Sequence, residues 1–147
     1  RVGPLGRLNV ADGCDTPLAN EEFHNFKKLG NDGVVQPSLY YHYARLIEML
    51  NTAEEIKSLV QDELICSKEI WVNSTKLNEE AVGVVEAPRG TLFHHYWIDT
   101  SGKIRKVNLI VATGHNNLAM NRAVYEVARG FIKDGKVTEG ILNRVED

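Results

Sequence analysis

The chain has 147 residues, of which 43% are hydrophobic and 25% are charged, a composition typical of one globular domain with room for a core. Its formal net charge is −3, and Lys and Arg are scattered among acidic residues, so it offers no basic surface for a phosphate backbone. We therefore expect a single domain, residues 1–147, with no nucleic-acid partner.

The apolar runs and the chain ends suggest a location and an origin. No run approaches the ~20 apolar residues that cross a bilayer, and no basic segment followed by an apolar run opens the chain, so we expect a cytoplasmic protein without membrane contact. Cys14 and Cys66 belong to no Cys-x-x-Cys pair, which favours buried free thiols. Because the chain opens on Arg1 without a methionine, we expect a fragment of a longer protein.

The N-terminal third predicts two helices. Residues 1–15 are rich in glycine and predict a loop with at most a short helix. Thr16 and Pro17 are typical of the N-cap and first position of a helix. The first long helix is therefore predicted at residues 17–28, with Gly30 ending it.

A second, longer helix is predicted from Ser38, as its N-cap, to about Glu63. Its apolar residues recur at spacings of three and four, which aligns them on one face: Leu39, Tyr43, Leu46, Leu50, Ala53, Ile56 and Val60. His42 and Arg45 lie one turn apart on it. They are either a functional pair or solvated side chains, and the usual exposure of polar residues favours the second.

The middle of the chain has the two-residue period of strands. A polar connector, residues 73–80, precedes a strand at 81–85. Residues 91–99 and 104–113 are rich in β-branched and aromatic residues, and the turn-like segment 100–103 separates them. This order predicts a β-hairpin.

The C-terminal part returns to helical spacing. A helix is predicted at residues 118–131, broken at Asp134 and Gly135, and Thr138 can cap a short final helix. The complete order predicts an α+β fold, mainly helical, with a small antiparallel β-hairpin or sheet inserted between the helices.

The most unusual segment is Glu-Ala-Pro-Arg-Gly at residues 86–90. Pro88 restricts φ and Gly90 permits a sharp turn, so Arg89 is predicted to be held by a stiff backbone. A fixed guanidinium can bind a small anionic or oxygen-bearing ligand. A purely structural pair between Arg89 and Glu86 is the alternative, and spacing alone favours that pair.

A second candidate segment is residues 111–117, where a strand ends at a glycine before a helix. Such a junction exposes backbone N–H groups and the Thr113 hydroxyl to small anions, although an ordinary strand-to-helix turn explains it equally well. His94 and His95 are adjacent on a strand and should point to opposite faces, which disfavours a shared metal ion. Phosphate-binding glycine loops and a serine-hydrolase elbow are absent from the sequence.

Three segments together, residues 1–9, 86–90 and 108–117, resemble the second half of the NiFe-hydrogenase large subunit, and the resemblance runs the length of the chain. It implies part of the catalytic subunit of an oxidoreductase that reversibly oxidises H2 to protons and electrons. In that family a nickel–iron centre with carbonyl and cyanide ligands is bound by four cysteines in two Cys-x-x-Cys pairs. This chain contains neither pair, so we expect the fragment alone to be inactive and to bind no metal.

The resemblance also implies roles for four residues. Arg89 matches the active-site arginine, which would act either as a base for H2 cleavage or as a positioning group. Pro88 and Arg89 would line the pocket of one cyanide. Ala112 and Thr113 match the turn that hydrogen-bonds the other cyanide, although Ala112 stands where many relatives have proline.

The sequence of residues 86–96, 111–121 and 139–146 is most similar to the soluble, cytoplasmic, bidirectional type of the family that couples to NAD. The partners implied by that type are diaphorase subunits with NAD and the iron–sulfur small subunit of hydrogenase. The alternative is a non-catalytic assembly or binding module, as in hydrogenase-related proteins of respiratory complexes that have lost the metal. Retention of Pro88, Arg89 and Thr113 together favours the enzyme.

Overall fold

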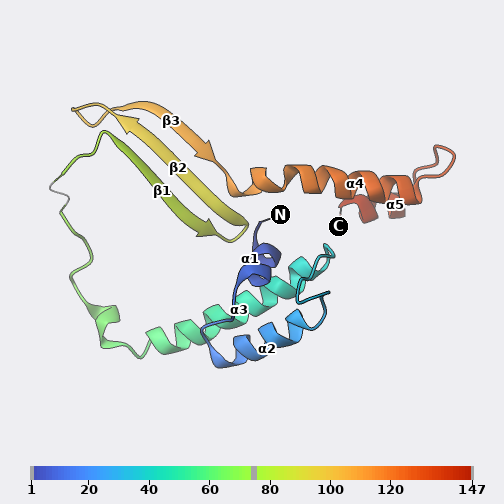
Figure 1. Ribbon diagram of the computed structural model, residues 1–147, viewed down its shortest axis with the longest axis horizontal. Coiled ribbons are helices and arrows are strands. Elements are labelled where there is room, and N and C mark those ends of the chain that lie inside the picture. Colours follow the sequence, from blue (N-terminus) through green and yellow to red (C-terminus); the bar gives the residue numbers. More distant parts are fainter. Residues whose placement is uncertain (1, 74–75, 147) are drawn as a thin grey trace.

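The computed structural model describes residues 2–73 and 76–146. Within them it contains five α-helices and one three-stranded antiparallel sheet, which confirms the predicted α+β fold. Helices α1–α3 lie together on one side, and the sheet and helices α4–α5 lie on the other (Figure 1). Two of the predicted segments lie partly outside the described residues: segment 1–9 lacks Arg1, and the predicted connector lacks residues 74–75.

The hydrophobic core belongs to the helical side of the molecule. It joins α1 (Pro4–Val10), α2 (Pro17–Lys27) and α3 (Tyr40–Leu59). The first is the short helix that the glycine-rich opening allowed, and the second confirms the predicted helix at 17–28. The buried residues of this core are Leu5, Leu8, Ala19, Phe23, Phe26, Val35, Ala44 and Ile47. Burial of each large apolar side chain contributes about 1.5–3 kcal/mol.

Helix α3 corrects part of the sequence prediction. It buries Ala44 and Ile47, whereas five residues of the predicted apolar face are exposed: Leu39, Leu46, Ala53, Ile56 and Val60. The helix carries apolar residues on more than one face, and α1 and α2 cover only one of them. It also ends at Leu59, before a short 3-10 helix, η1 (Glu63–Cys66), and Ser38 makes no side-chain cap.

Helix α2 is capped from another helix. Thr16 occupies the N-cap position but makes no side-chain cap of its own; its hydroxyl instead donates to Glu54 Oε2 at 2.6 Å. The same carboxylate accepts from the backbone N–H groups of Leu18 and Ala19 at 3.1 and 3.0 Å. Thr16 and these N–H groups lower the pKa of Glu54. The exposed start of α2 is thereby joined to α3 by a charge-assisted cap.

The sheet has the order β1–β2–β3, formed by β1 (Glu80–Ala87), β2 (Gly90–Ile98) and β3 (Ile104–Ile110). It confirms the predicted hairpin, and the strand predicted at residues 81–85 is β1, which pairs with β2. Asp99 Oδ1 organises the β2–β3 turn by accepting from the backbone N–H groups of Ser101 and Lys103. The two outer strands are exposed along nearly their whole length.

The C-terminal helices extend away from the core. A 3-10 helix, η2 (Ala112–Asn116), leads from the sheet into α4 (Asn117–Phe131), and α5 (Glu139–Glu146) folds back against α4 (Figure 1). Asp134, at φ 52°, forms the turn between them. Neither α4 nor α5 has a buried residue. Throughout residues 2–73 and 76–146, no helix has the length and apolar character needed to span a bilayer.

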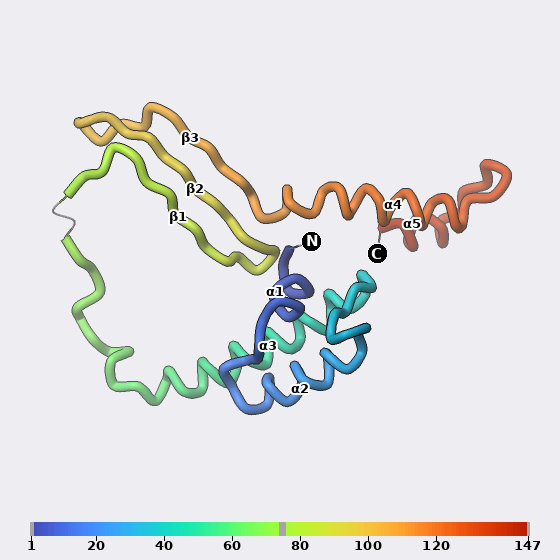
Figure 2. The backbone as a smooth tube through the Cα atoms, viewed as in Figure 1, coloured from blue at the N-terminus to red at the C-terminus, as the bar shows by residue number. Residues whose placement is uncertain are grey.

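Both cysteines are free, as expected, but only one is even partly covered. Cys14 is half-buried, and Cys66 is exposed. Cys66 lies at the end of η1, in the long connection that leaves the core before the sheet (Figure 2). The expectation of two buried thiols is therefore wrong, because η1 has no buried residue and leaves its thiol open to solvent.

The Glu54 cap predicts a local effect of substitution. Glu54→Gln keeps the side-chain shape but removes the charge, so amide hydrogen exchange of Leu18 and Ala19 should become faster while exchange in the middle of α3 stays unchanged. Glu55→Gln is the matched control, because Glu55 accepts from Asn51 of its own helix and does not reach α2. Equal exchange at Leu18 and Ala19 in all three proteins would show that Glu54 does not cap α2.

Candidate functional site

The unusual 86–90 segment is the tight turn between β1 and β2. Ala87 pairs with Gly90, which leaves Pro88 and Arg89 as the two turn residues. Gly90 has φ +136°, and a Cβ there would lie 2.4 Å from Val2 Cγ2. Only glycine fits this position without a shift, because the conformation is strained for other residues and the space is filled. The structure confirms the predicted sharp turn at Gly90, with Arg89 as one of the two turn residues.

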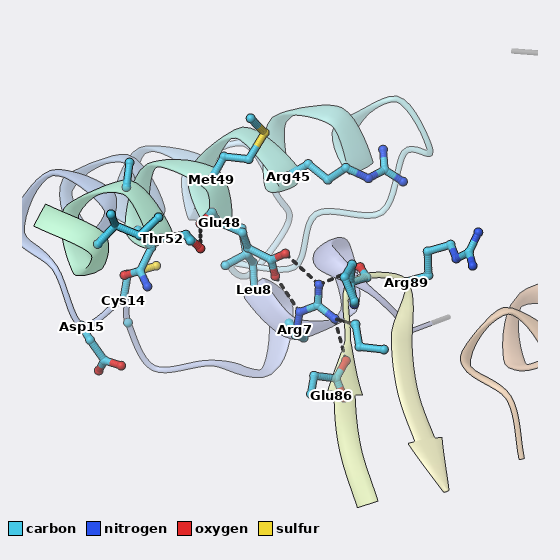
Figure 3. Close-up of a pocket in the computed structure, with 16 residues that line it drawn as sticks. Arg7, Leu8, Cys14, Asp15, Arg45, Glu48, Met49, Thr52, Glu86 and Arg89 are labelled. Carbon is cyan, nitrogen blue, oxygen red and sulfur yellow. Dashed lines mark hydrogen bonds and ion pairs between the residues drawn. The ribbon is translucent and has the colours of Figure 1, made fainter. Parts of the chain in front are cut away.

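Arg7 of α1 fastens this turn to the helical core (Figure 3). Its Nε and Nη2 donate to the two carboxylate oxygens of Glu48 on α3 at 2.6 and 2.7 Å. Nη1 donates to Glu86 Oε1 at 2.6 Å and to the Ala87 carbonyl at 2.8 Å, and Nη2 also donates to the Pro88 carbonyl at 3.0 Å. All five N–H donors of the guanidinium are therefore used.

The charges in this network reinforce one another. The Glu48 hydrogen bond raises the pKa of Arg7 against the opposing effect of partial burial, and Glu86 adds to the increase. Burial raises the pKa of Glu86, but hydrogen bonds from Thr91 and Arg7 outweigh it and leave that pKa below its usual value. Both partners are thus held in their charged forms, as a bidentate arginine–carboxylate contact requires.

The structural pair between Arg89 and Glu86, which spacing favoured, is not formed. Glu86 binds Arg7 and the Thr91 hydroxyl instead. Arg89 is exposed, and among the described residues its side chain makes no hydrogen bond or ion pair. Its side chain extends away from the Arg7–Glu86 contact (Figure 3). The guanidinium is therefore available to a ligand.

The N-terminal residues also hold the second candidate segment. The Asn116 side chain pairs with the backbone of Val2, accepting from its N–H at 2.9 Å and donating to its carbonyl at 3.1 Å. Tyr41 of α3 donates to the same carbonyl at 3.0 Å. Gly3 then approaches the other turn so closely that a Cβ on it would lie 2.9 Å from the Arg89 carbonyl oxygen. Residues 2–7 therefore contact both candidate segments.

A cleft of about 490 Å³ brings Arg89 and Thr113 together. His42 and Arg45 of α3 line it as well, and no aspartate or glutamate of the described chain does. The Thr113 hydroxyl makes no hydrogen bond within the described residues. The cleft thus offers cationic groups and a free hydroxyl, a donor set suited to a small anionic or lone-pair-bearing ligand.

The other two predicted site residues lie differently. Ala112 is buried, with 6% of its surface exposed, and does not line this cleft. Pro88 lines an adjoining groove of about 780 Å³, together with Arg7, Arg45 and Arg89 (Figure 3). Arg89 and Arg45 therefore face both spaces, whereas Thr113 faces only the first.

The two adjacent histidines of β2 have separate partners. His94 Nδ1 is 2.9 Å from Tyr96 Oη, and His95 Nε2 is 2.8 Å from Glu80 Oε1. Among the residues that the structure describes, no group of three or more His, Cys, Asp or Glu side chains is placed to hold a metal ion. The described residues therefore offer hydrogen-bond donors, in the cleft of Arg89 and Thr113, rather than metal ligands.

The role of Arg7 was not predicted. Its partners lie 41 and 79 positions away in the sequence, beyond the reach of any helical or strand spacing. The one local signal is a charged residue close to Leu5 and Leu8, which are both buried. An arginine so close to a core usually has an acidic partner.

Hydrogenases share the sequence of this chain over nearly its whole length. No protein-family model matches the chain. It is 42% identical over 149 residues to the NAD-reducing hydrogenase HoxS subunit beta of Cupriavidus necator, covering 99% of the chain and 30% of that protein. It is 45% identical over 150 residues to one subunit of the F420-non-reducing hydrogenase of Methanothermobacter thermautotrophicus, covering 99% and 31%. This chain is hydrogenase-related.

A solved structure agrees with the sequence relatives. A chain in a crystal structure of an NAD+-reducing NiFe-hydrogenase in the H2-reduced state superposes with a TM-score of 0.91 at 41% identity, covering 99% of this chain and 32% of the matched chain. The fold is therefore that of a hydrogenase segment. The hydrogenase-related chain spans about a third of the length of the relatives it matches.

The Arg7 network predicts the titration of Glu86. Because the folded pKa lies below the usual 4.5, the carboxylate contributes to stability above that pH, and the contribution is lost as pH falls through the folded pKa. Thr91→Val removes one hydrogen bond and should raise the pKa of Glu86 toward 4.5 in a ¹³C NMR titration of the chain. Thr52→Val, which removes a hydroxyl bonded only within α3, should leave it unchanged. A Glu86 pKa at or above 4.5 in the unsubstituted chain would contradict the network.

Proposed function

We propose that the chain is part of the large, catalytic subunit of a NiFe hydrogenase that reversibly oxidises H2 to protons and electrons. In this proposal residues 1–147 form one structural unit of a longer protein, and they supply side chains around the active site rather than metal ligands. The observation that carries the proposal is the shared cleft: Arg89 and Thr113, distant in sequence, line one space, each with a donor group that no described residue occupies.

The donor set of the cleft fits the group that such an enzyme contains. Cyanide bound to iron carries a lone pair and negative charge, and it is stabilised by N–H and O–H donors in a site from which carboxylates are absent. Arg89 would donate to one cyanide and Thr113 to the other. Pro88, in the adjoining groove, and Ala112, buried outside the cleft, would flank these two residues without lining the cleft themselves. Bound by cysteines outside this chain, the nickel–iron centre would supply the polarisation of H2.

The proposed role of Arg89 in H2 oxidation follows from the properties of its guanidinium group. An arginine stays protonated across the working range of enzymes, so its guanidinium is better suited to donating hydrogen bonds than to accepting a proton. We infer that Arg89 orients the reacting groups and stabilises developing negative charge, which is commonly the largest single contribution to catalysis. The Arg7 network and Gly90 hold the backbone from which it reaches the cleft.

The assembly of the complete enzyme is proposed from its relatives. One relative is named as a subunit of an NAD-reducing hydrogenase, and the superposed structure is of an NAD+-reducing enzyme. We propose the same type here: an iron–sulfur small subunit receives the electrons and diaphorase subunits pass them to NAD, in the cytoplasm. The extensive exposed apolar surface of β1, β3 and α4 is consistent with a segment that packs against the rest of a larger protein.

Substitution of Arg89 in the complete enzyme tests the proposal. Arg89→Lys keeps the charge but loses the planar fork of donors, and we expect H2 oxidation to fall by about 10²-fold or more, with nickel content unchanged. Arg105→Lys is the same exchange at a residue of β3 that lines neither the cleft nor the adjoining groove; it is the matched control and should retain activity. Full activity in the Arg89 variant would exclude the proposed role. A complete wild-type protein without nickel or H2 oxidation would favour the non-catalytic module instead.

A further inference from the structure

We propose that the segment Val2–Arg7, here called the N-terminal clamp, positions Arg89 and Thr113 relative to each other. The clamp makes its contacts at two places: its Arg7 end holds the turn of Arg89, and its Val2 end holds the segment of Thr113. The inference rests on the proposed function, because that function gives the relative placement of these two side chains its importance.

The first arm of the clamp fixes the backbone immediately before Arg89. The Pro88 carbonyl belongs to the peptide that joins Pro88 to Arg89, and it accepts from Arg7 Nη2 at 3.0 Å. The Ala87 carbonyl accepts from Nη1 at 2.8 Å. Two successive peptide planes are therefore held by one rigid, planar group, which restricts the direction in which the Arg89 side chain leaves the turn.

The anchor of this arm lies in the core. Glu48 holds Arg7 by a bidentate contact of 2.6 and 2.7 Å, and it stands on the same helix as the buried residues Ala44 and Ile47. The turn is thus connected through Arg7 to a helix that contributes to the hydrophobic core. Because every N–H of Arg7 is already engaged, its guanidinium has no donor left for a ligand and acts only through the turn.

The same segment closes on the other side of the turn. A Cβ on Gly3 would lie 2.9 Å from the Arg89 carbonyl oxygen, and one on Gly90 would lie 2.4 Å from Val2 Cγ2. At Gly3 the two backbones therefore lie next to each other, and at Gly90 the Val2 side chain packs against the turn. The carbonyls on both sides of Arg89 meet the clamp, one through Arg7 and the other against Gly3.

The second arm reaches the Thr113 segment. Asn116 is the last residue of η2, the short helix that contains Thr113. Its Oδ1 accepts from the Val2 N–H at 2.9 Å, and its Nδ2 donates to the Val2 carbonyl at 3.1 Å. A side-chain amide paired with both polar groups of one residue fixes distance and orientation together. Tyr41 attaches the same Val2 carbonyl to α3.

Packing alone does not place these two segments. The outer strands of the sheet are exposed, and α4 has no buried residue, so the polar contacts of the clamp contribute to the placement of both segments within this chain. A displacement of about 1 Å in an active site can reduce the rate about 10²-fold. We therefore expect clamp substitutions to change turnover even though neither Arg7 nor Val2 lines the cleft shared by Arg89 and Thr113.

A double-mutant cycle in the complete enzyme tests the first arm. Arg7→Lys keeps the charge, but an ammonium group cannot make the five hydrogen bonds of the planar guanidinium. We therefore expect kcat for H2 oxidation to fall about 10-fold while KM and nickel content stay unchanged. In the Arg89→Lys background, Arg7→Lys should cost nothing further, because Arg7 acts through Arg89. An equal loss in both backgrounds, or no loss in either, would overturn the proposal.

A second variant protects this test against misfolding. If the Arg7→Lys protein does not assemble, Glu48→Gln is used instead, because it weakens the contact that anchors Arg7 while retaining helix α3. We expect Glu48→Gln to lower kcat about 10-fold when Arg89 is intact and to cause no further loss in the Arg89→Lys variant. The second arm is tested in parallel by Asn116→Leu, whose effect on kcat should vanish in the Thr113→Val background. Arg105→Lys is the control in every background and should be neutral. Additive effects of Asn116→Leu and Thr113→Val would overturn the second arm.

A structural measurement separates failure of the clamp from failure of the proposed function. Amide hydrogen exchange of residues 86–91 in the complete protein, followed by mass spectrometry, does not depend on a metal centre. Arg7→Lys should increase exchange there and leave residues 19–26 unchanged. If the protein proved not to be a hydrogenase, increased exchange would still support the clamp, whereas unchanged exchange would reject it whatever the enzyme assay showed.

Discussion

The guanidinium of Arg7 is the contact on which the arrangement of this molecule depends. Isolated ion pairs at a protein surface contribute little to stability. Arg7 differs because it is only 24% exposed and donates five hydrogen bonds, three of them to carboxylates on two different elements and two to backbone carbonyls. Removing it would leave two carboxylates and the Pro88–Arg89 turn without their common partner. One side chain therefore connects a packed helical core to a sheet that has little packing of its own.

The hydrophobic core and the candidate site lie in different parts of the molecule, and hydrogen bonds join them. Helices α1–α3 bury the apolar residues, while the sheet and α4–α5 carry the segments that contain Arg89 and Thr113. Hydrogen bonds are directional, so a few of them at the turn can orient a side chain that hydrophobic contact would only place approximately. The glycines at positions 3 and 90 allow the backbones to come close enough for those bonds to form.

Much of the fold could be predicted from the sequence, and the failures have physical causes. Proline and glycine marked the ends of α2 and the turns of the sheet, because they restrict or extend φ locally. The apolar face of α3 was predicted only in part: Tyr43 and Leu50 pack against the core, but apolar residues surround the helix and tertiary contacts select among them. The Arg7–Glu86 contact spans 79 positions, and no local rule reaches that far. Arg89 and Thr113 were singled out by family resemblance, and their shared cleft gives that choice a geometric basis.

The central claim is that the Arg7-fastened turn directs Arg89, beside Thr113, at a nickel–iron centre held by the rest of the protein. A crystal structure of the complete large subunit with its metals tests this most directly. We predict that Arg7 keeps its contacts to Glu48, Glu86 and the two turn carbonyls, and that the Arg89 guanidinium and the Thr113 hydroxyl both face the metal centre. A structure in which Arg89 faces bulk solvent or forms an ion pair remote from the metals would contradict the account.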